Sequence, residues 1–157
     1  MKEKVYIETS VVSYFTSRPS TDIIIAGRQK ITRKKWPNIL EAFDTYISAL
    51  VLQESKQGDY KAVQKRLKAI SDIPVLSITG DAEKLASVLI MEGPISEKSP
   101  EDALHISIAT TNGMDYLLTW NFAHINNAQM KSKIASRIAR HGYQCPLICS
   151  LEELLGE

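Results

Sequence analysis

Short apolar segments, separated by longer segments of helical periodicity, constrain the fold of this chain more than any other feature. The apolar segments are Val5 to Ile7, Phe43 to Ile47, Pro74 to Ile78, Tyr116 to Thr119 and Pro146 to Cys149. The run from Tyr116 is continuously apolar rather than alternating, which is typical of a parallel strand buried on both faces. Parallel neighbours need a helix between them, so the alternation predicts an α/β fold: a parallel sheet with helices on both faces.

The alternation runs along the chain without a repeat, a low-complexity segment or a domain boundary, so we expect one domain over residues 1–157. A chain of 157 residues with 44% hydrophobic and 24% charged residues is typical of a globular protein with a substantial core. The net charge of +1 provides no global attraction to nucleic acid, so any basic surface must be local.

The N-terminal segment and the two cysteines indicate where in the cell the protein is expected. In residues 1–8 a run of only three apolar residues precedes a carboxylate, which is too short for a signal peptide, and no run reaches about 18 apolar residues. Cys145 and Cys149 are too few for a disulfide framework. Their spacing from His141 resembles a metal site, but the intervening Pro146 prevents one helical face from presenting all three, which favours ordinary buried thiols. We expect a cytoplasmic protein without a membrane segment.

Three acids are placed where a parallel sheet binds ligands. Glu8 follows the first strand, Glu54 lies in the helix after the second, and Asp102 opens the helix that begins after Ser99. Ligands bind beyond the carboxyl ends of such strands, so the three carboxylates can meet. Together they need a cation or protons for neutralisation, and oxygen ligands suit Mg²⁺ or Mn²⁺.

Each acid also has a structural explanation. Asp102 stands three residues after Ser99, the spacing of a capping box, and Glu54 can be a surface acid. Glu8 is the hardest to explain in this way, because a charge next to a buried strand is costly.

Four segments, in this order, resemble the PIN-domain family over roughly residues 4–149. They are Val5 to Ser10, Leu52 to Glu54, Glu101 to His105 and Leu117 to Phe122. The resemblance implies a three-layer α/β/α fold with a central parallel sheet, and a ribonuclease that depends on Mg²⁺ or Mn²⁺. Many small members resemble VapC toxins of type II toxin–antitoxin pairs, which implies a homodimer held inactive by a small antitoxin protein.

The resemblance also assigns site residues. Glu8, Glu54 and Asp102 match the metal-binding acids, and Asn121 matches a fourth catalytic position that is often Asp. The hydroxyl positions beside the site match Thr9, Ser10 and Thr119. Two departures matter, because Glu8 is one methylene longer than the usual Asp and Asn121 lacks a charge, which weakens any second metal site.

His105 matches a family position too. It lies within an apolar helical run, so we predict a hydrogen-bonded core histidine rather than a catalyst.

Two basic segments are candidate surfaces for RNA. Their candidate RNA-binding residues are Arg28, Arg33, Lys34, Lys133, Arg137 and Arg140. Such runs are more often solvated helix faces than ligand sites. From the three acids and the family resemblance together, we predict a metal-dependent endoribonuclease. Its expected substrate is unpaired RNA, whose splayed bases are accessible to side chains. The alternative is a catalytically weak or inactive PIN-like module that binds RNA or protein.

Overall fold

The computed structural model describes residues 1–156, which form five strands and eight helices. The strands are β1 Lys4–Ile7, β2 Asp44–Ser48, β3 Val75–Leu76, β4 Tyr116–Leu118 and β5 Leu147–Cys149. The helices are α1 Thr9–Thr16, α2 Ile23–Ala42, α3 Ala49–Ser55, α4 Tyr60–Ala69, α5 Gly80–Met91, α6 Pro100–Thr111, α7 Ala128–Arg140 and α8 Leu151–Leu155.

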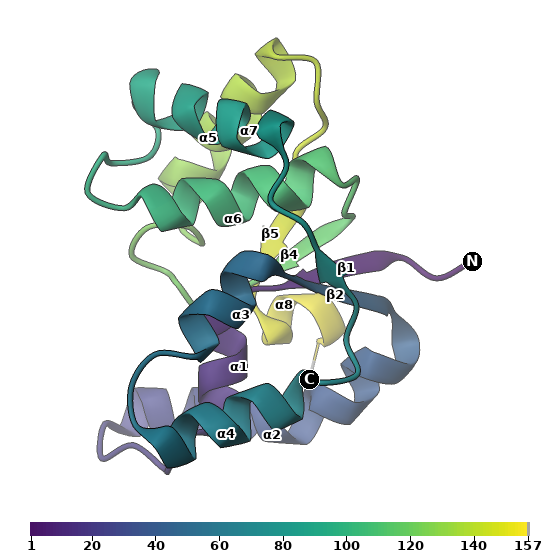
Figure 1. The fold of residues 1–157 in the computed structure, drawn as a ribbon, viewed down its shortest axis with the longest axis vertical. Coiled ribbons are helices and arrows are strands. Elements are labelled where there is room, and N and C mark those ends of the chain that lie inside the picture. Colours follow the sequence, from purple (N-terminus) through teal and green to yellow (C-terminus); the bar gives the residue numbers. More distant parts are fainter. Residues whose placement is uncertain (157) are drawn as a thin grey trace.

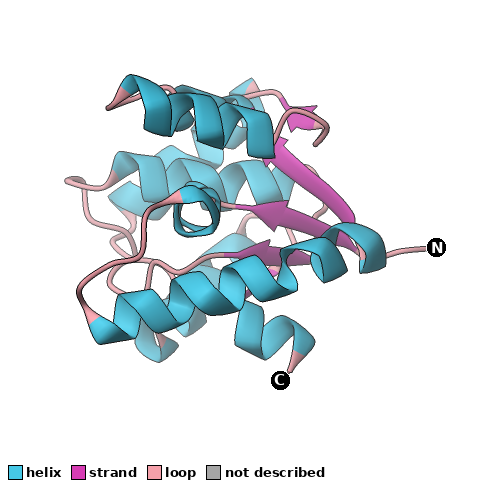
Figure 2. Cartoon of the chain, turned by 90° about the horizontal axis from the view of Figure 1, so that it is seen from below, coloured by secondary structure: helices cyan, strands magenta, loops and turns pink. Residues whose placement is uncertain are grey.

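The five strands form one parallel sheet in the order β3-β2-β1-β4-β5. Helices α5, α6 and α7 pack together on one face, and α1 to α4 with α8 cover the other (Figures 1 and 2). Val5, Tyr6 and Ile7 of the central strand are fully buried between these two layers. The expected three-layer α/β/α fold with a parallel sheet is confirmed. None of the helices within residues 1–156 is both long and apolar enough to cross a membrane.

The order of the strands creates a switch point between β1 and β4. From β1 the chain moves outward to β2 and β3, then returns through α5 and α6 to β4 on the other side of β1. The connections on the two sides therefore cover opposite faces of the sheet, which leaves a crevice at the carboxyl ends of β1 and β4. The segments that follow these two strands begin at Glu8 and Thr119.

Helix α2 corrects one prediction from the sequence. A proline typically ends a helix, so Pro37 predicts the start of a new element, yet it lies inside α2, which continues to Ala42. A proline inside a helix costs about 3 kcal/mol because a hydrogen bond is lost and the ring clashes with the preceding turn. Packing on both sides of Pro37 offsets this cost, since Trp36 and Ile39 are buried and Trp36 stacks on Phe15 with ring centroids 4.3 Å apart.

Two predicted helix caps are also corrected. The sequence predicts Asp81 as the N-cap of α5, because Asp is a preferred capping residue, but the N-cap is Thr79, whose side chain accepts a hydrogen bond from the backbone N–H of Ala82. Ser99 precedes α6 as expected, but its side chain makes no capping hydrogen bond. A capping box with Ser99 therefore does not explain Asp102. Helix α6 ends just before Gly113, which adopts a φ of 69°, a conformation that favours glycine after a helix.

Candidate metal centre

Four segments meet at the carboxyl edge of the sheet, around the switch point. Glu8 follows β1 and is the N-cap of α1, and Glu54 lies in the last turn of α3. Asp102 lies in the first turn of α6, and Asn121 follows β4. Glu54, Asp102 and Asn121 line a common cavity of about 600 Å³, together with His124. The structure thus gathers residues that are more than 100 positions apart in the sequence.

Glu8 is buried and tied to the hydroxyl groups beside it. Its Oε1 atom accepts hydrogen bonds from Ser10 Oγ at 2.5 Å and Thr119 Oγ1 at 2.6 Å, while Oε2 accepts one from the backbone N–H of Ser10 at 3.1 Å. Ser10 Oγ also accepts a hydrogen bond from the backbone N–H of Trp120, at 2.9 Å. These contacts join the segment after β1 to the segment after β4. They also offset the free-energy cost of burying the carboxylate.

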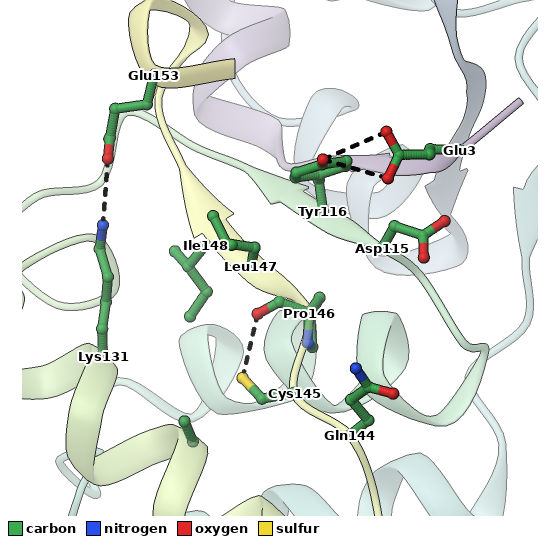
Figure 3. Close-up of a pocket in the computed structure, with 11 residues that line it drawn as sticks. Glu3, Asp115, Tyr116, Lys131, Gln144, Cys145, Pro146, Leu147, Ile148 and Glu153 are labelled. Atoms are coloured by element: carbon green, nitrogen blue, oxygen red, sulfur yellow. Dashed lines mark hydrogen bonds and ion pairs between the residues drawn. The ribbon is translucent and has the colours of Figure 1, made fainter.

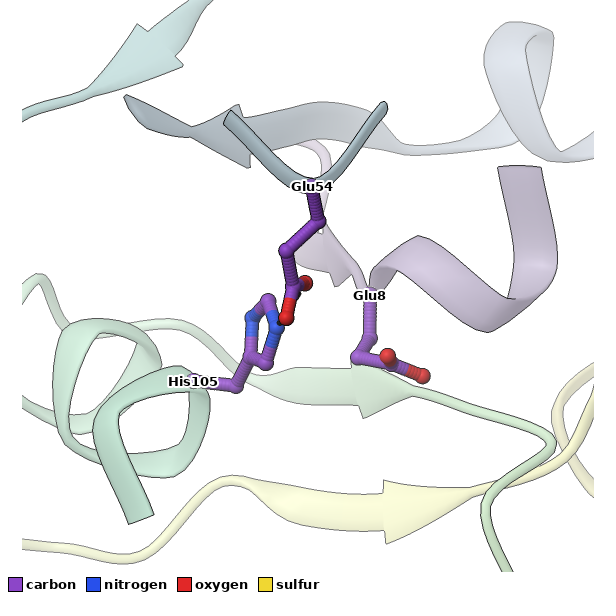
Figure 4. Close-up of side chains that lie close together, drawn as sticks. All are labelled: Glu8, Glu54 and His105. Carbon is purple, nitrogen blue, oxygen red and sulfur yellow. Dashed lines mark hydrogen bonds and ion pairs between the residues drawn. The ribbon is translucent and has the colours of Figure 1, made fainter. Parts of the chain in front are cut away.

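Glu54 is paired with His105, a buried histidine of α6 (Figure 4). His105 Nε2 lies 2.7 Å from Glu54 Oε1, and Thr9 Oγ1 donates to the same oxygen at 2.5 Å. Burial alone would raise the pKa of Glu54, but the hydrogen bonds from His105 and Thr9 and the charge on His105 bring it below its ordinary value. Burial opposes the charged form of His105, yet Glu54 and the nearby acids raise the pKa of the imidazole.

Asp102 and Asn121 form a second pair in the site. Asn121 Nδ2 donates to Asp102 Oδ1 at 3.2 Å, and Asn121 Oδ1 accepts from the backbone N–H of His124 at 3.1 Å. Burial raises the pKa of Asp102, and the charge of Glu8 acts in the same direction. An amide at position 121 therefore supplies a hydrogen-bond donor where a carboxylate would repel Asp102.

The donor set fits a divalent cation. One ligand atom from each of Glu8, Glu54 and His105 lies within 4.8 Å of the other two, and Asp102 is close enough for the charge of Glu8 to raise its pKa. Three carboxylates accompanied by one histidine leave a surplus of negative charge. Carboxylate oxygens are the ligands that Mg²⁺ and Mn²⁺ prefer.

His105 confirms the prediction of a hydrogen-bonded core histidine, but its contact with Glu54 was not foreseen. A signal for it exists in the sequence, because His105 stands three residues after Asp102 and residues at this spacing share a helix face. Tyr6, whose hydroxyl lies 2.7 Å from His105 Nδ1, gave no such signal, because strand tyrosines are common in buried sheets.

The two basic segments are not brought together. Arg28, Arg33 and Lys34 lie on α2, whereas Lys133, Arg137 and Arg140 lie on α7, on the opposite face of the sheet (Figure 1). The guanidinium of Arg28 stacks over the ring of Phe122, 4.6 Å from its centroid. Arg137 Nε lies 3.7 Å from a carboxylate oxygen of Glu92. Lys35, which belongs to the same basic run as Arg28, is buried and donates to the backbone carbonyl of Gly156.

A second cavity, of about 460 Å³, lies away from the acids (Figure 3). Glu3 and Asp115, which line it, directly precede β1 and β4, so this cavity opens at the amino ends of the strands. The hydroxyl of Tyr116 donates to Glu3 there, at 3.2 and 3.3 Å from the two carboxylate oxygens. Since ligands of parallel sheets bind at the carboxyl ends, the acidic edge is the better candidate site.

Comparison with known proteins defines the fold further. No family model and no curated protein sequence matches the chain. Among solved structures, VapC20 of Mycobacterium tuberculosis, a sarcin-ricin loop cleaving toxin, aligns with a TM-score of 0.57 and 16% identity, over 82% of this chain and 94% of that chain. VapBC2 from Rickettsia felis, bound to a DNA fragment from its promoter, aligns with a TM-score of 0.60 and 15% identity, over 94% and 98%.

A toxin–antitoxin complex from Klebsiella pneumoniae is also similar, with a TM-score of 0.53 and 17% identity, over 80% of this chain and 93% of that chain. The chain is therefore an α/β/α protein of the kind found in these toxin structures. Its fold is that of the PIN domain, as the sequence resemblance implied.

Proposed function

We propose that this protein is a divalent-metal-dependent endoribonuclease that acts in the cytoplasm as the toxin of a toxin–antitoxin pair. The observation that carries the proposal is the convergence of Glu8, Glu54 and Asp102 at the switch point of a PIN fold. The similarity of the fold to toxin structures adds support.

Glu8, Glu54 and Asp102 would hold the cation. A cation bound there supplies Lewis-acid activation of a phosphodiester and of a water nucleophile. The protein fixes the ligands in advance: Ser10 and Thr119 orient Glu8, and Asn121 orients Asp102. A carboxylate of the same cluster, through an oxygen that does not hold the cation, would accept the proton released by the attacking water.

The RNA backbone would pass along the basic residues nearest the site. Arg28 is the best placed of them, because its guanidinium is held against Phe122, which follows Asn121 in the chain. It forms no ion pair with any of residues 1–156, so its donors are available to a phosphate. Arg33 and Lys34 are exposed on the same helix, but five and six residues after Arg28 they are rotated by more than about 100° from it, so they lie outside this surface.

Cleavage of a mixed RNA pool tests the proposal. The parent protein should cleave RNA in Mn²⁺ and stop when the metal is chelated. Asp102→Asn should abolish cleavage and retain the fold, because the amide removes a ligand charge without changing the shape of the side chain. Asp81→Asn is the matched control, since Asp81 lies in the first turn of the neighbouring helix α5 and outside the site. Equal cleavage rates for the parent and Asp102→Asn would contradict the metal assignment.

A catalytically inactive binding module is the second candidate. It is favoured by Glu8, whose two oxygens already accept three hydrogen bonds, one of them as the N-cap of α1, and by the neutral Asn121. Tight binding of RNA without products, in Mn²⁺ and with purified protein, would support this function against the enzyme.

We further propose that the protein forms a homodimer and binds a small antitoxin. A surplus of carboxylates attracts a basic side chain when metal is absent, and two of the similar structures are described as a VapBC pair and a toxin–antitoxin complex. Sedimentation should show a dimer, and affinity capture should recover a small protein encoded beside it. A monomer that captures no such protein would refute both parts.

A further inference from the structure

Glu54 presents two different oxygens. Oε1 accepts both hydrogen bonds made to this carboxylate, from Thr9 Oγ1 at 2.5 Å and from His105 Nε2 at 2.7 Å. Oε2 accepts no hydrogen bond from residues 1–156, and the side chain is 25% exposed, on the wall of the 600 Å³ cavity. Two donors on one oxygen fix the rotation of the carboxylate and leave the other oxygen for a ligand.

The second ring nitrogen of His105 is also within hydrogen-bonding distance of a buried side chain. Its Nδ1 atom lies 2.7 Å from the hydroxyl of Tyr6, which lies 2.7 Å from Ser48 Oγ. Ser48 Oγ in turn accepts from the backbone N–H of Val51, at 3.2 Å, as the N-cap of α3. Tyr6 and Ser48 are fully buried and His105 is 1% exposed, so these hydrogen bonds are shielded from water.

The row of hydrogen bonds does not depend on the charge of the imidazole. The hydroxyls of Tyr6 and Ser48 can each donate or accept, so they can pair with Nδ1 whether it carries a proton or not. Both ring nitrogens of His105 are occupied, one by Glu54 and one by Tyr6. The ring is therefore oriented to form a hydrogen bond with Glu54 rather than to bind a cation itself.

We propose that His105 is a positioning residue which, supported by Tyr6 and Ser48, turns Oε2 of Glu54 toward the cation. The inference rests on the metal site of the proposed function. It also links the site to α3, because Ser48 caps the helix that carries Glu54. Partners that orient a metal ligand typically change metal affinity by about 10- to 100-fold when they are removed.

Two substitutions of His105 separate positioning from other roles. The amide nitrogen of Gln reaches the place of Nε2 and can still donate to Glu54, whereas the shorter Asn reaches only the place of Nδ1. His105→Asn should weaken Mn²⁺ binding, measured by calorimetry at one fixed pH, by about 10- to 100-fold. His105→Gln should stay within about threefold of the parent. An imidazole that binds the metal directly predicts an equal loss in both variants, and that result would overturn the proposal.

A second pair of variants avoids the buried histidine, in case His105→Asn does not fold. Thr9→Val removes the other donor to Glu54 Oε1 and should also weaken Mn²⁺ binding. Thr16→Val is the matched control, because Thr16 lies in the same helix and its hydroxyl donates to the backbone carbonyl of Val12. Equal Mn²⁺ affinities for these two variants would count against the orientation of Glu54 by its donors.

Measurement of both binding and cleavage distinguishes this inference from the proposed function. A parent that cleaves RNA, with undiminished Mn²⁺ affinity in His105→Asn, overturns the inference alone. A parent that binds Mn²⁺ through His105 and Thr9 but cleaves no RNA overturns the proposed ribonuclease alone. A parent that binds no Mn²⁺ overturns both.

Discussion

Replacement of Asn121 by aspartate should destabilise the protein without metal and strengthen its binding of metal. Asn121 Nδ2 donates to Asp102 Oδ1 at 3.2 Å, so Asn121→Asp exchanges this donor for a second negative charge beside Asp102. Two unit charges about 4 Å apart repel by about 1 kcal/mol in water and about 4 kcal/mol at the effective dielectric of a protein surface. Both side chains are half-buried, so a value between these limits applies, about 2 kcal/mol.

The lost hydrogen bond adds about 1 kcal/mol to this cost. In chelator the variant should therefore be less stable by about 3 kcal/mol, which for a chain of this size lowers the melting temperature by about 6–12 °C. In Mn²⁺ the added carboxylate strengthens binding to the folded state. At saturating Mn²⁺ a tenfold tighter Kd would stabilise the variant by about 1.4 kcal/mol more than the parent, so about half of the loss should be recovered.

Thermal melting of parent and variant, each in chelator and in millimolar Mn²⁺, measures both effects. Asn38→Asp is the matched control, because Asn38 is exposed on α2 and the same change there should alter stability by no more than about 0.5 kcal/mol. If Asn121→Asp shifts the melting temperature equally in the two conditions, Asn121 does not face a metal.

Three further tests address the Glu54–His105 pair, the hydroxyl beside Glu8 and the turn at the end of α6. The pKa of His105 is raised from 6.5 and that of Glu54 lowered from 4.5, so their pairing stabilises the fold between these values. This stability is lost as pH rises through the folded-state pKa of His105 or falls through that of Glu54, and the advantage of the parent over His105→Gln in urea unfolding should shrink at both extremes. Thr119→Val removes a buried donor to Glu8 and should cost about 1–3 kcal/mol in urea unfolding, whereas Thr119→Ser should cost less; equal losses would refute a role for the hydroxyl. Gly113→Ala should cost about 1 kcal/mol in the same assay, because φ is positive there, and an unchanged midpoint would contradict that conformation.

The sequence alone determined the succession of strands and helices along the chain and the edge of the sheet at which the acids lie. These properties depend on local patterns: the short apolar run from Tyr116 to Leu118 follows a turn signal and therefore indicates a buried strand, and Asn112 with Gly113 ends the helix before it. Because all five strands are parallel, Glu8, directly after β1, and Asn121, three residues after the end of β4, had to lie at the same edge of the sheet.

Tertiary structure decided what each side chain touches. The pairing of His105 with Glu54 joins residues 51 positions apart, and its contact with Tyr6 spans 99 positions, so neither distance is fixed by a local pattern. The continuation of α2 through Pro37 also depended on packing, because the buried Trp36 and Ile39 outweigh the helix-breaking tendency of proline. Local periodicity specifies which face of an element is apolar, but only the packing of two elements selects the partner that a polar side chain meets there.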